Sequence, residues 1–326
     1  MSVLITGGAG YIGAHVVRLL SERGDAVVVV DDLSSGDPAR LSGARLEKRD
    51  LTTGDARSAL AQVMREHQVT RVVHLAARKQ AAESVEVPEE YFRDNIGGLA
   101  AVIGACADAG VRRLVFSSSA AVYGMPATAT VDERTPTLPI NPYGESKLVG
   151  EWLVRDAVRA HGIDAVSLRY FNVAGAGWPD LGDPHSLNLV TIAIDRIRRG
   201  LPPIVYGGDF DTHDGTGVRD YIHVLDLAGA HLAALDALDS APDSPRARVF
   251  NVGTGSGASV LEVLDRLRSV SGIPFEPVVE PRRPGDPDAV VADASRIAEE
   301  LGWRATRSLD EMITSAWTAD RTAQLA

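Results

Sequence analysis

Gly7-Gly8-Ala9-Gly10-Tyr11-Ile12-Gly13 connects a short β-branched run, Val3–Thr6, to a helical pattern over Tyr11–Arg23. Its glycines fit both the spacing G-x-G-x-x-G and the wider spacing G-x-x-G-x-x-G. Glycines at such positions let the turn close, let the backbone approach a pyrophosphate and let the helix pack tightly on the strand. The N-terminus of the helix then presents its dipole and its free N–H groups to phosphates. The stretch therefore predicts a dinucleotide-binding turn between a first strand and a first helix.

A carboxylate stands where the adenosine ribose of a dinucleotide would bind. Asp31 ends the second predicted strand, Ala26–Asp31, at about the 20-residue distance from the glycines that such sites use. An acid at this point accepts hydrogen bonds from the ribose hydroxyls and repels a 2′-phosphate, so NAD is favoured over NADP. Asp50 and Leu51 follow the third predicted strand and could reach the adenine, although an isolated aspartate at a strand end also suits a turn or a helix cap.

Strand and helix patterns alternate through the first half of the chain. The further predicted strands are Arg45–Lys48, Val72–Leu75, Leu114–Ser118 and Ala165–Tyr170, and the further helices are Ala56–His67, Pro88–Ala109 and 141–161. Apolar strands that alternate with helices indicate a parallel sheet covered on both faces. The predicted fold class is therefore α/β: a Rossmann-type doubly wound parallel sheet with a smaller, interwoven C-terminal α/β substrate region.

The chain is less regular after Phe171. We expect loops over 172–188 and 207–220, helices over 188–199 and Asp226–Leu238, and strands over Val249–Val252 and Phe275–Val279. Ser259 opens a capping box, and Asp226, Asp293 and Ser308 match helix N-caps. These patterns divide the chain into a dinucleotide-binding domain, residues 1–171, and a mainly substrate-binding region, residues 172–326, with segments of about 220–255 returning to the first domain.

Composition restricts the classes of partner. The 326 residues are 45% apolar and carry a formal net charge of −11, which argues against a nucleic acid or an anionic membrane as partner. The lone Cys106 cannot form an internal disulfide, which suits a reducing compartment. The N-terminus does not match a signal peptide, and no apolar run approaches the roughly 20 residues of a membrane span. We therefore expect a cytoplasmic protein with no membrane partner, and we predict no metal site.

Tyr143, Lys147 and Ser119 form a second candidate group. Tyr143 and Lys147 are four residues apart, so on a helix they share one face. An ammonium beside a phenol favours the ionised phenol, so a group with a pKa of about 10 becomes usable as a base near neutrality. Ser119 lies at the end of a central predicted strand, where open α/β sheets bind ligands. Beside a nicotinamide, these groups could move a proton and a hydride at one carbon; the alternative is an exposed tyrosine and a solvated lysine.

Longer motifs extend this interpretation over almost the whole chain. They are Thr6–Gly13, Phe116–Gly124, Asn141–Lys147, Leu168–Asn172, Asp214–Val224, Pro281–Asp286 and Leu309–Met312. With them the chain resembles the extended short-chain dehydrogenases/reductases and, within that group, the UDP-glucose 4-epimerases. The motif Asp214–Val224 is the most specific, because it is long and lies outside the nucleotide-binding half.

The resemblance implies an isomerase that interconverts UDP-galactose and UDP-glucose through a 4-keto intermediate with tightly bound NAD. It implies that Tyr143 is the base, that Ser119 assists it and that Lys147 lowers its pKa. The implied cofactor-binding residues are Gly7, Gly10, Tyr11, Ile12, Gly13, Asp31, Asp50, Leu51, Leu75, Ala76, Ala77, Lys79, Asn95, Ser117, Tyr143, Lys147 and Tyr170. The implied UDP-sugar-binding residues are Ser119, Tyr143, Asn172, Asn188, Leu189, Tyr206, Arg219, Arg283, Asp286 and Val290.

The resemblance also implies a homodimer built through the helices at about 88–109 and 143–161, although ordinary packing on the sheet would explain the same apolar positions. The chain departs from the family pattern at Val290, where epimerases restricted to glucose and galactose carry a tyrosine. Acceptance of N-acetylated UDP-hexoses is therefore an alternative, and Val290 as a simple pocket wall is another. An epimerase of UDP-pentoses is a further alternative. The loop from Gly175 to Leu187 is also shorter than in well-known members.

Two other functions fit the same fold. A nucleotide-sugar dehydratase needs an Asp-Glu pair just after the serine or threonine of the site, and Ala120 and Ala121 stand there instead. A non-catalytic NAD-binding regulator on the same fold would be favoured by loss of Tyr143 or Lys147, and both are present. We therefore rank both functions below the epimerase.

Overall fold

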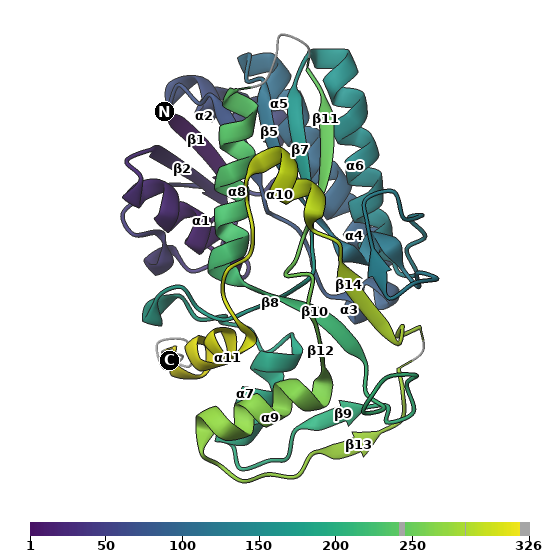
Figure 1. The fold of residues 1–326 in the computed structure, drawn as a ribbon. Helices are drawn as coiled ribbons and strands as arrows, with labels where there is room; N and C mark the ends of the chain where they lie inside the picture. Colours follow the sequence, from purple (N-terminus) through teal and green to yellow (C-terminus); the bar gives the residue numbers. More distant parts are fainter. Residues whose placement is uncertain (241–244, 284, 320–326) are drawn as a thin grey trace.

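The computed structural model describes residues 1–240, 245–283 and 285–319 and contains a large parallel sheet with helices on both faces (Figure 1). The strands of this sheet are β1 (Ser2–Thr6), β2 (Ala26–Asp31), β3 (Arg45–Lys48), β4 (Arg71–His74), β5 (Arg113–Ser119), β7 (Asp164–Tyr170) and β11 (Ala247–Val252). They lie in the order β11-β7-β5-β4-β1-β2-β3, and neighbouring strands are parallel. The predicted α/β class with a doubly wound sheet is confirmed. The strand order reverses between β1 and β4, the place where such sheets bind ligands at the carboxyl ends of the strands.

Alternate side chains of each strand enter two separate cores. Ile5 is in register with Val29 and Val73, and these residues pack with α1 (Tyr11–Glu22) and α8 (Val224–Asp239). Leu4, one position earlier, packs with α2 (Ala56–Glu66), α5 (Gly98–Ala109) and α6 (Pro142–His161) on the opposite face. Full burial of each such side chain contributes about 1.5–3 kcal/mol. The near-continuous apolar strands therefore require helices on both faces.

A second region is built from shorter strands. Its larger sheet consists of β6 (Thr130–Val131), β8 (Asn172–Ala174), β10 (Val218–His223), β12 (Gly257–Ser259) and β14 (Ala289–Ala292), and β9 (Ile204–Tyr206) pairs with β13 (Val278–Glu280). The helices α7 (Leu189–Arg198), α9 (Val260–Ser271) and α11 (Leu309–Thr318) share one apolar core with β9 and β10. Figure 1 shows α8, β11 and α10 (Ser295–Leu301), all from the last third of the chain, beside the large sheet rather than with this second region.

Several expected loops contain short elements. The segment 172–188 was expected to be loop, but it includes β8 and the 3-10 helix η4 (Pro179–Leu181). β8 pairs with β10, which lies about fifty positions later in the chain. The sequence patterns also did not predict the strands β6, β12 and β14. Each of these strands has two to four residues and, like β8, is stabilised by partners distant in sequence.

The single helix expected over Pro88–Ala109 is divided. It consists of α4 (Pro88–Tyr91), a π-helical stretch η2 (Phe92–Gly97) and α5, and a short helix α3 (Ala81–Glu86) precedes it. A π-helix inserts an extra residue into the helical turn and often occurs at functional sites. Nothing in the apolar periodicity predicted this insertion.

The helix caps were only partly predicted. Ser259 and Ser308 form the expected capping boxes. Asp226 as N-cap was wrong: His223 caps α8, and the buried Asp226 accepts hydrogen bonds from the N–H groups of Thr306 and Arg307. Asp293 lies one position before the N-cap of α10, and its carboxylate accepts from the N–H of Ser295. The strand expected over 275–279 begins only at Val278.

Gly13 tests the close packing of the first turn. A Cβ on Gly13 would overlap the carbonyl oxygen of Gly7, whereas a Cβ on the helical Gly97 would meet nothing within 4 Å. We expect Gly13→Ala to lower the free energy of unfolding by about 3 kcal/mol through overpacking. Gly97→Ala should leave it unchanged or raise it by up to about 1 kcal/mol, because alanine favours the helix. Urea denaturation compares the two variants, and equal stability would contradict the packing argument.

Candidate active site

The glycine turn forms an open backbone cradle at the switch point of the sheet. Gly7 has a φ of +71° and approaches the segment that follows β4 so closely that a Cβ would lie 2.7 Å from the amide nitrogen of Ala76. Gly10 is the N-cap of α1 and supplies no side-chain acceptor for the first turn of the helix. The N–H groups of Ile12 and Gly13 in that turn can therefore serve an anionic ligand. These features fit the pyrophosphate of a dinucleotide.

Asp31 lies beside this cradle and is 8% exposed. Its carboxylate accepts hydrogen bonds from the N–H of Ala9 at 3.0 Å and of Leu33 at 2.9 Å. Burial raises the pKa of Asp31, and these two hydrogen bonds offset part of that rise. Each carboxylate oxygen retains capacity for a further hydrogen bond, so ribose hydroxyls can still be accepted.

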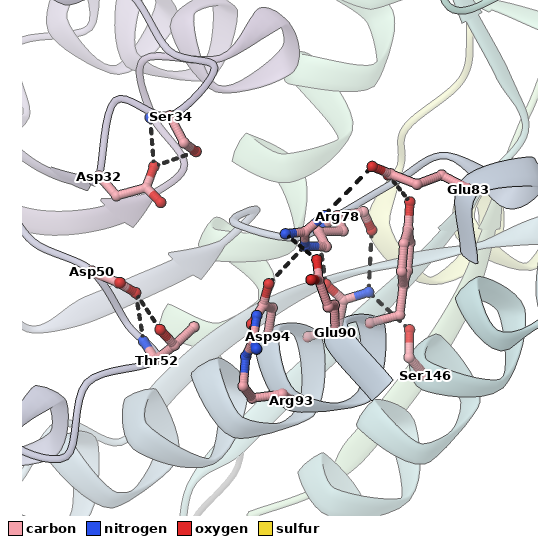
Figure 2. Close-up of polar contacts among 12 residues, drawn as sticks. Asp32, Ser34, Asp50, Thr52, Arg78, Glu83, Glu90, Arg93, Asp94 and Ser146 are labelled. Atoms are coloured by element: carbon pink, nitrogen blue, oxygen red, sulfur yellow. Dashed lines mark hydrogen bonds and ion pairs between the residues drawn. The ribbon is translucent and has the colours of Figure 1, made fainter. Parts of the chain in front are cut away.

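Asp32 and Asp50 stand in turns at the ends of β2 and β3. Figure 2 shows the carboxylate of Asp32 with Ser34 and that of Asp50 with Thr52. The Asp50 side chain is thus engaged in an Asx turn, the alternative that an isolated aspartate left open. Leu51 is half-buried and packs on the core of α5.

The segment after β4 carries several of the expected cofactor positions. Leu75 and Ala76 are half-buried, and Ala77 and Lys79 are exposed. Asn95, on the π-helix, is buried and bonds both the N–H and the carbonyl of Arg78, at 2.8 and 3.1 Å. The Asn95 side chain is therefore occupied by the protein backbone of this segment.

Tyr143, Lys147 and Ser119 meet at the carboxyl end of β5. Asn141 caps α6 by accepting from the N–H of Gly144 at 2.9 Å, and Pro142 fits the first helical position, so the helix begins just before Tyr143. The Ser119 side chain lies beside the Tyr143 hydroxyl. The Nζ atom of Lys147 donates to the carbonyl of Ser117 at 3.0 Å and lies 5.9 Å from the centre of the Tyr143 ring. All three side chains are less than 10% exposed. Tyr143 and Lys147 lie on the same face of α6, as their spacing predicted.

In the protein chain alone, the pKa of Tyr143 lies above its ordinary value. Burial raises the pKa of Tyr143, and the neighbouring Ser119 side chain offsets part of the rise. Burial also lowers the pKa of Lys147 to about 8, so its ammonium remains mostly charged at pH 7. The phenol is removed from water, and the ammonium of Lys147 is directed at the Ser117 carbonyl.

A buried hydrogen-bond chain beneath this site was not expected. Ser117 lies beside the side chain of Tyr170, and its Oγ lies 3.0 Å from Nε2 of His231. Nδ1 of His231 lies 2.9 Å from the carbonyl of Leu227, which can only accept, so Nδ1 carries the proton and Nε2 accepts from Ser117. His231 lies on α8, far from Ser117 in sequence, and no spacing in the chain predicted the pair.

A second buried network supports the other side of β5. The guanidinium of Arg169 forms a two-point pair with Glu151, at 2.8 and 2.7 Å, and Ser118 donates to the same carboxylate at 2.6 Å. Glu151 follows Lys147 by four residues and so shares its helix face, a signal that the sequence did contain. The network fixes the strand end that carries Ser119.

The expected substrate residues form separate small groups. Arg219 is in register with Val290 on the neighbouring strand and pairs with Asp286 at 3.3 Å. Arg283 stacks over the ring of Tyr206 at 3.8 Å. Pro284, which belongs to the motif Pro281–Asp286, lies outside the described residues.

The remaining substrate candidates lie near α7 and β8. Asn188 caps α7: its side chain accepts from Thr191 and donates to Asp183, so it is already engaged. Leu189 is the first residue of that helix, and Asn172 is exposed at the start of β8.

The described residues contain neither a candidate metal site nor a candidate membrane span. Across 1–240, 245–283 and 285–319, no group of three or more His, Cys, Asp or Glu side chains is placed to hold a metal ion. Among those same residues, none of the helices combines the length and the apolarity needed to cross a bilayer.

Known proteins are similar to this chain in sequence and in fold. Residues 3–253 match the NAD dependent epimerase/dehydratase family. The chain is 45% identical to the UDP-glucose 4-epimerase of Azospirillum brasilense, over 99% of this chain and 92% of that one, and 42% identical to that of Streptococcus mutans, over 97% and 96%.

Solved structures of similar proteins have the same fold. A UDP-glucose 4-epimerase from Stenotrophomonas maltophila, with bound NAD and formylated UDP-arabinopyranose, has a TM-score of 0.92 and 41% identity, covering 99% of this chain and 98% of its own. One from Bifidobacterium longum, in complex with NAD+ and UDP, has a TM-score of 0.88 and 36% identity, covering 98% and 97%. Together with the glycine cradle and the buried Tyr143, Ser119 and Lys147, these matches show that the chain belongs to the NAD dependent epimerase/dehydratase family, among its UDP-glucose 4-epimerases.

Proposed function

We propose that this protein is a UDP-hexose 4-epimerase that interconverts UDP-galactose and UDP-glucose through a 4-keto intermediate with tightly bound NAD. The observation that carries the proposal is the burial of Tyr143, Ser119 and Lys147 in one site at the carboxyl end of β5. This site lies along the same sheet edge as the glycine cradle, so a proton acceptor and a dinucleotide can serve one carbon. Ala120 and Ala121 begin the 3-10 helix η3 (Ala120–Tyr123) and offer no proton donor, which disfavours a dehydratase.

The groups that would hold NAD fit its chemistry. The first turn of α1 would bind the pyrophosphate, Asp31 the adenosine ribose and Lys147 the nicotinamide ribose. Bound NAD would supply the acceptor, and afterwards the donor, of the hydride at C4 of the sugar. The solved relatives with bound NAD support this assignment.

Tyr143 would take the proton of the 4-hydroxyl. The Ser119 side chain lies beside the Tyr143 hydroxyl and can bridge it to the reacting oxygen. The charged Lys147 lies on the same helix face as Tyr143. Together with the positive charge of an oxidised nicotinamide, its ammonium would favour the phenolate form of Tyr143. Return of the proton from Tyr143 to the same oxygen would complete the reaction on the other face of the sugar.

We propose that residues 1–171 mainly bind NAD and residues 172–326 mainly bind the UDP-sugar. Arg219 and Arg283 are suited to the diphosphate, because guanidinium groups pair with phosphate oxygens through two N–H bonds. Arg219 would exchange its contact with Asp286 for such a phosphate. The lone Cys106 is buried, which is consistent with a proposed cytoplasmic location.

Tyr143→Phe tests the proposed reaction. Purified protein without added NAD should convert UDP-galactose to UDP-glucose, and Tyr143→Phe should lower kcat by about 10²–10⁴-fold, because the proton acceptor is removed. Bound NAD and thermal stability should be unchanged, since the substitution removes one hydroxyl. Product analysis by chromatography measures both proteins. Unimpaired turnover in the variant would reject the role of Tyr143, and no conversion by the wild-type protein would reject the proposed function.

Val290 supports a broader sugar specificity. Its side chain is 8% exposed beside Arg219 in the register of β10 and β14, where a small residue leaves space near the proposed substrate groups. We expect the protein to epimerise UDP-N-acetylgalactosamine as well, and we expect Val290→Tyr to reduce that activity at least tenfold more than the activity on UDP-galactose. Equal losses with both substrates would show that Val290 is only a structural wall.

We also propose a homodimer formed through α5 and α6. The two helices lie side by side, and Trp152 on α6 is 49% exposed, so a partner subunit could cover it. Light scattering should give the mass of two chains, and Trp152→Glu should shift it toward one. A wild-type protein with the mass of one chain would contradict the proposal.

A further inference from the structure

Arg78 lies in the middle of the segment that is expected to line the NAD groove. Leu75, Ala76, Ala77 and Lys79, around it, are all expected cofactor positions. The guanidinium of Arg78 instead contacts the side chains of α3, α4 and the π-helix (Figure 2).

Three carboxylates surround this guanidinium. Nε pairs with Asp94 at 2.7 Å, one terminal nitrogen pairs with Glu90 at 2.7 Å and the other with Glu83 at 3.5 Å. Single surface pairs contribute little to stability, but one arginine shared by three acids also removes the repulsion among them. Loss of Arg78 would leave this group without its central cation, and Arg93 contacts only Asp94 among the three.

The backbone of the same segment is held by two further side chains. Tyr91 accepts from the N–H of Gln80 and donates to Glu83 at 2.6 Å. Asn95 bonds both backbone groups of Arg78, as described above. The extra residue of the π-helix accompanies the inward position of Asn95.

Asn95 also connects the segment to the catalytic helix. Its Nδ2 donates to Ser146 Oγ at 2.9 Å, and Ser146 donates to the carbonyl of Tyr143 at 2.8 Å. The position of residues 75–80 is therefore coupled to the first turn of α6, which carries Tyr143 and Lys147.

We propose that Arg78 is a positioning residue for the cofactor: its contacts with Glu83, Glu90 and Asp94 hold residues 75–80, and with them Lys79, at the NAD groove. The proposal rests on the proposed function only in taking NAD as the ligand of that groove. Arg78 acts through the segment and takes no part in proton transfer. Its loss should therefore weaken NAD retention rather than the chemistry of the loaded enzyme.

Arg78→Met tests the proposal, because methionine keeps an apolar stem and removes the guanidinium. We expect labelled NAD to exchange out of the holoprotein about tenfold faster than from the wild type. Activity on UDP-galactose at low enzyme concentration should fall, and excess NAD should restore kcat to near the wild-type value. Glu90→Gln, which removes one of the 2.7 Å partners, should act in the same direction with a smaller effect.

Arg93→Met is the matched control. Arg93 also pairs with Asp94 at 2.7 Å, but its side chain is 59% exposed and lies outside the segment 75–80. NAD exchange from this variant should match the wild type. Equal exchange from Arg78→Met and the wild type, or a loss of kcat that excess NAD does not restore, would overturn the proposal.

Hydrogen exchange separates this proposal from the proposed function. Amides of residues 75–86 should exchange faster in Arg78→Met than in the wild type and Arg93→Met, with or without nucleotide. If the wild-type protein binds no NAD, the proposed function fails, but hydrogen exchange still tests whether Arg78 holds residues 75–80 in place. Unchanged exchange of those amides in Arg78→Met would reject the positioning role of Arg78 even in an active epimerase.

Discussion

The hydrogen bond between Lys147 Nζ and the carbonyl of Ser117 is the interaction on which the site depends. It joins the first turns of α6 to the carboxyl end of β5, in a place where neither partner reaches water. A buried ammonium is unfavourable without acceptors, so its preferred position is beside that carbonyl. This contact fixes the helix face that carries Tyr143, and through it the position of the Tyr143 hydroxyl next to Ser119.

Buried polar networks extend this rigidity on both faces of β5. Ser117 bonds toward His231 on one face and Ser118 toward Glu151 on the other, since successive residues of a strand point to opposite faces. Arg169 continues the second network to Tyr123, whose hydroxyl donates to Asn251 at 2.6 Å. Asn251 in turn bonds the carbonyl of Val131 on β6, the neighbour of β14. A continuous path of hydrogen bonds thus connects the strand end that carries Ser119 to the sheet that carries Val290.

Local patterns were sufficient where the physical cause is local. The glycine spacing, the apolar strands and the capping boxes at Ser259 and Ser308 depend on neighbouring residues, and all of these features are present. The short strands β6, β8, β12 and β14 were missed because their stability comes from partners far along the chain. Asp226 was misassigned for a related reason: its carboxylate serves residues 306 and 307, which no local pattern could reveal.

The sequence by itself determined the α/β class, the dinucleotide turn and the choice of Tyr143, Lys147 and Ser119, because helix periodicity and strand polarity act over a few residues. The tertiary structure decided the protonation preferences of these groups, since burial raises the pKa of Tyr143 and lowers the pKa of Lys147. It also decided the partners of Arg78, Asn95 and His231. Such contacts form only when the chain brings distant segments together, and the energy of each depends on water being excluded there.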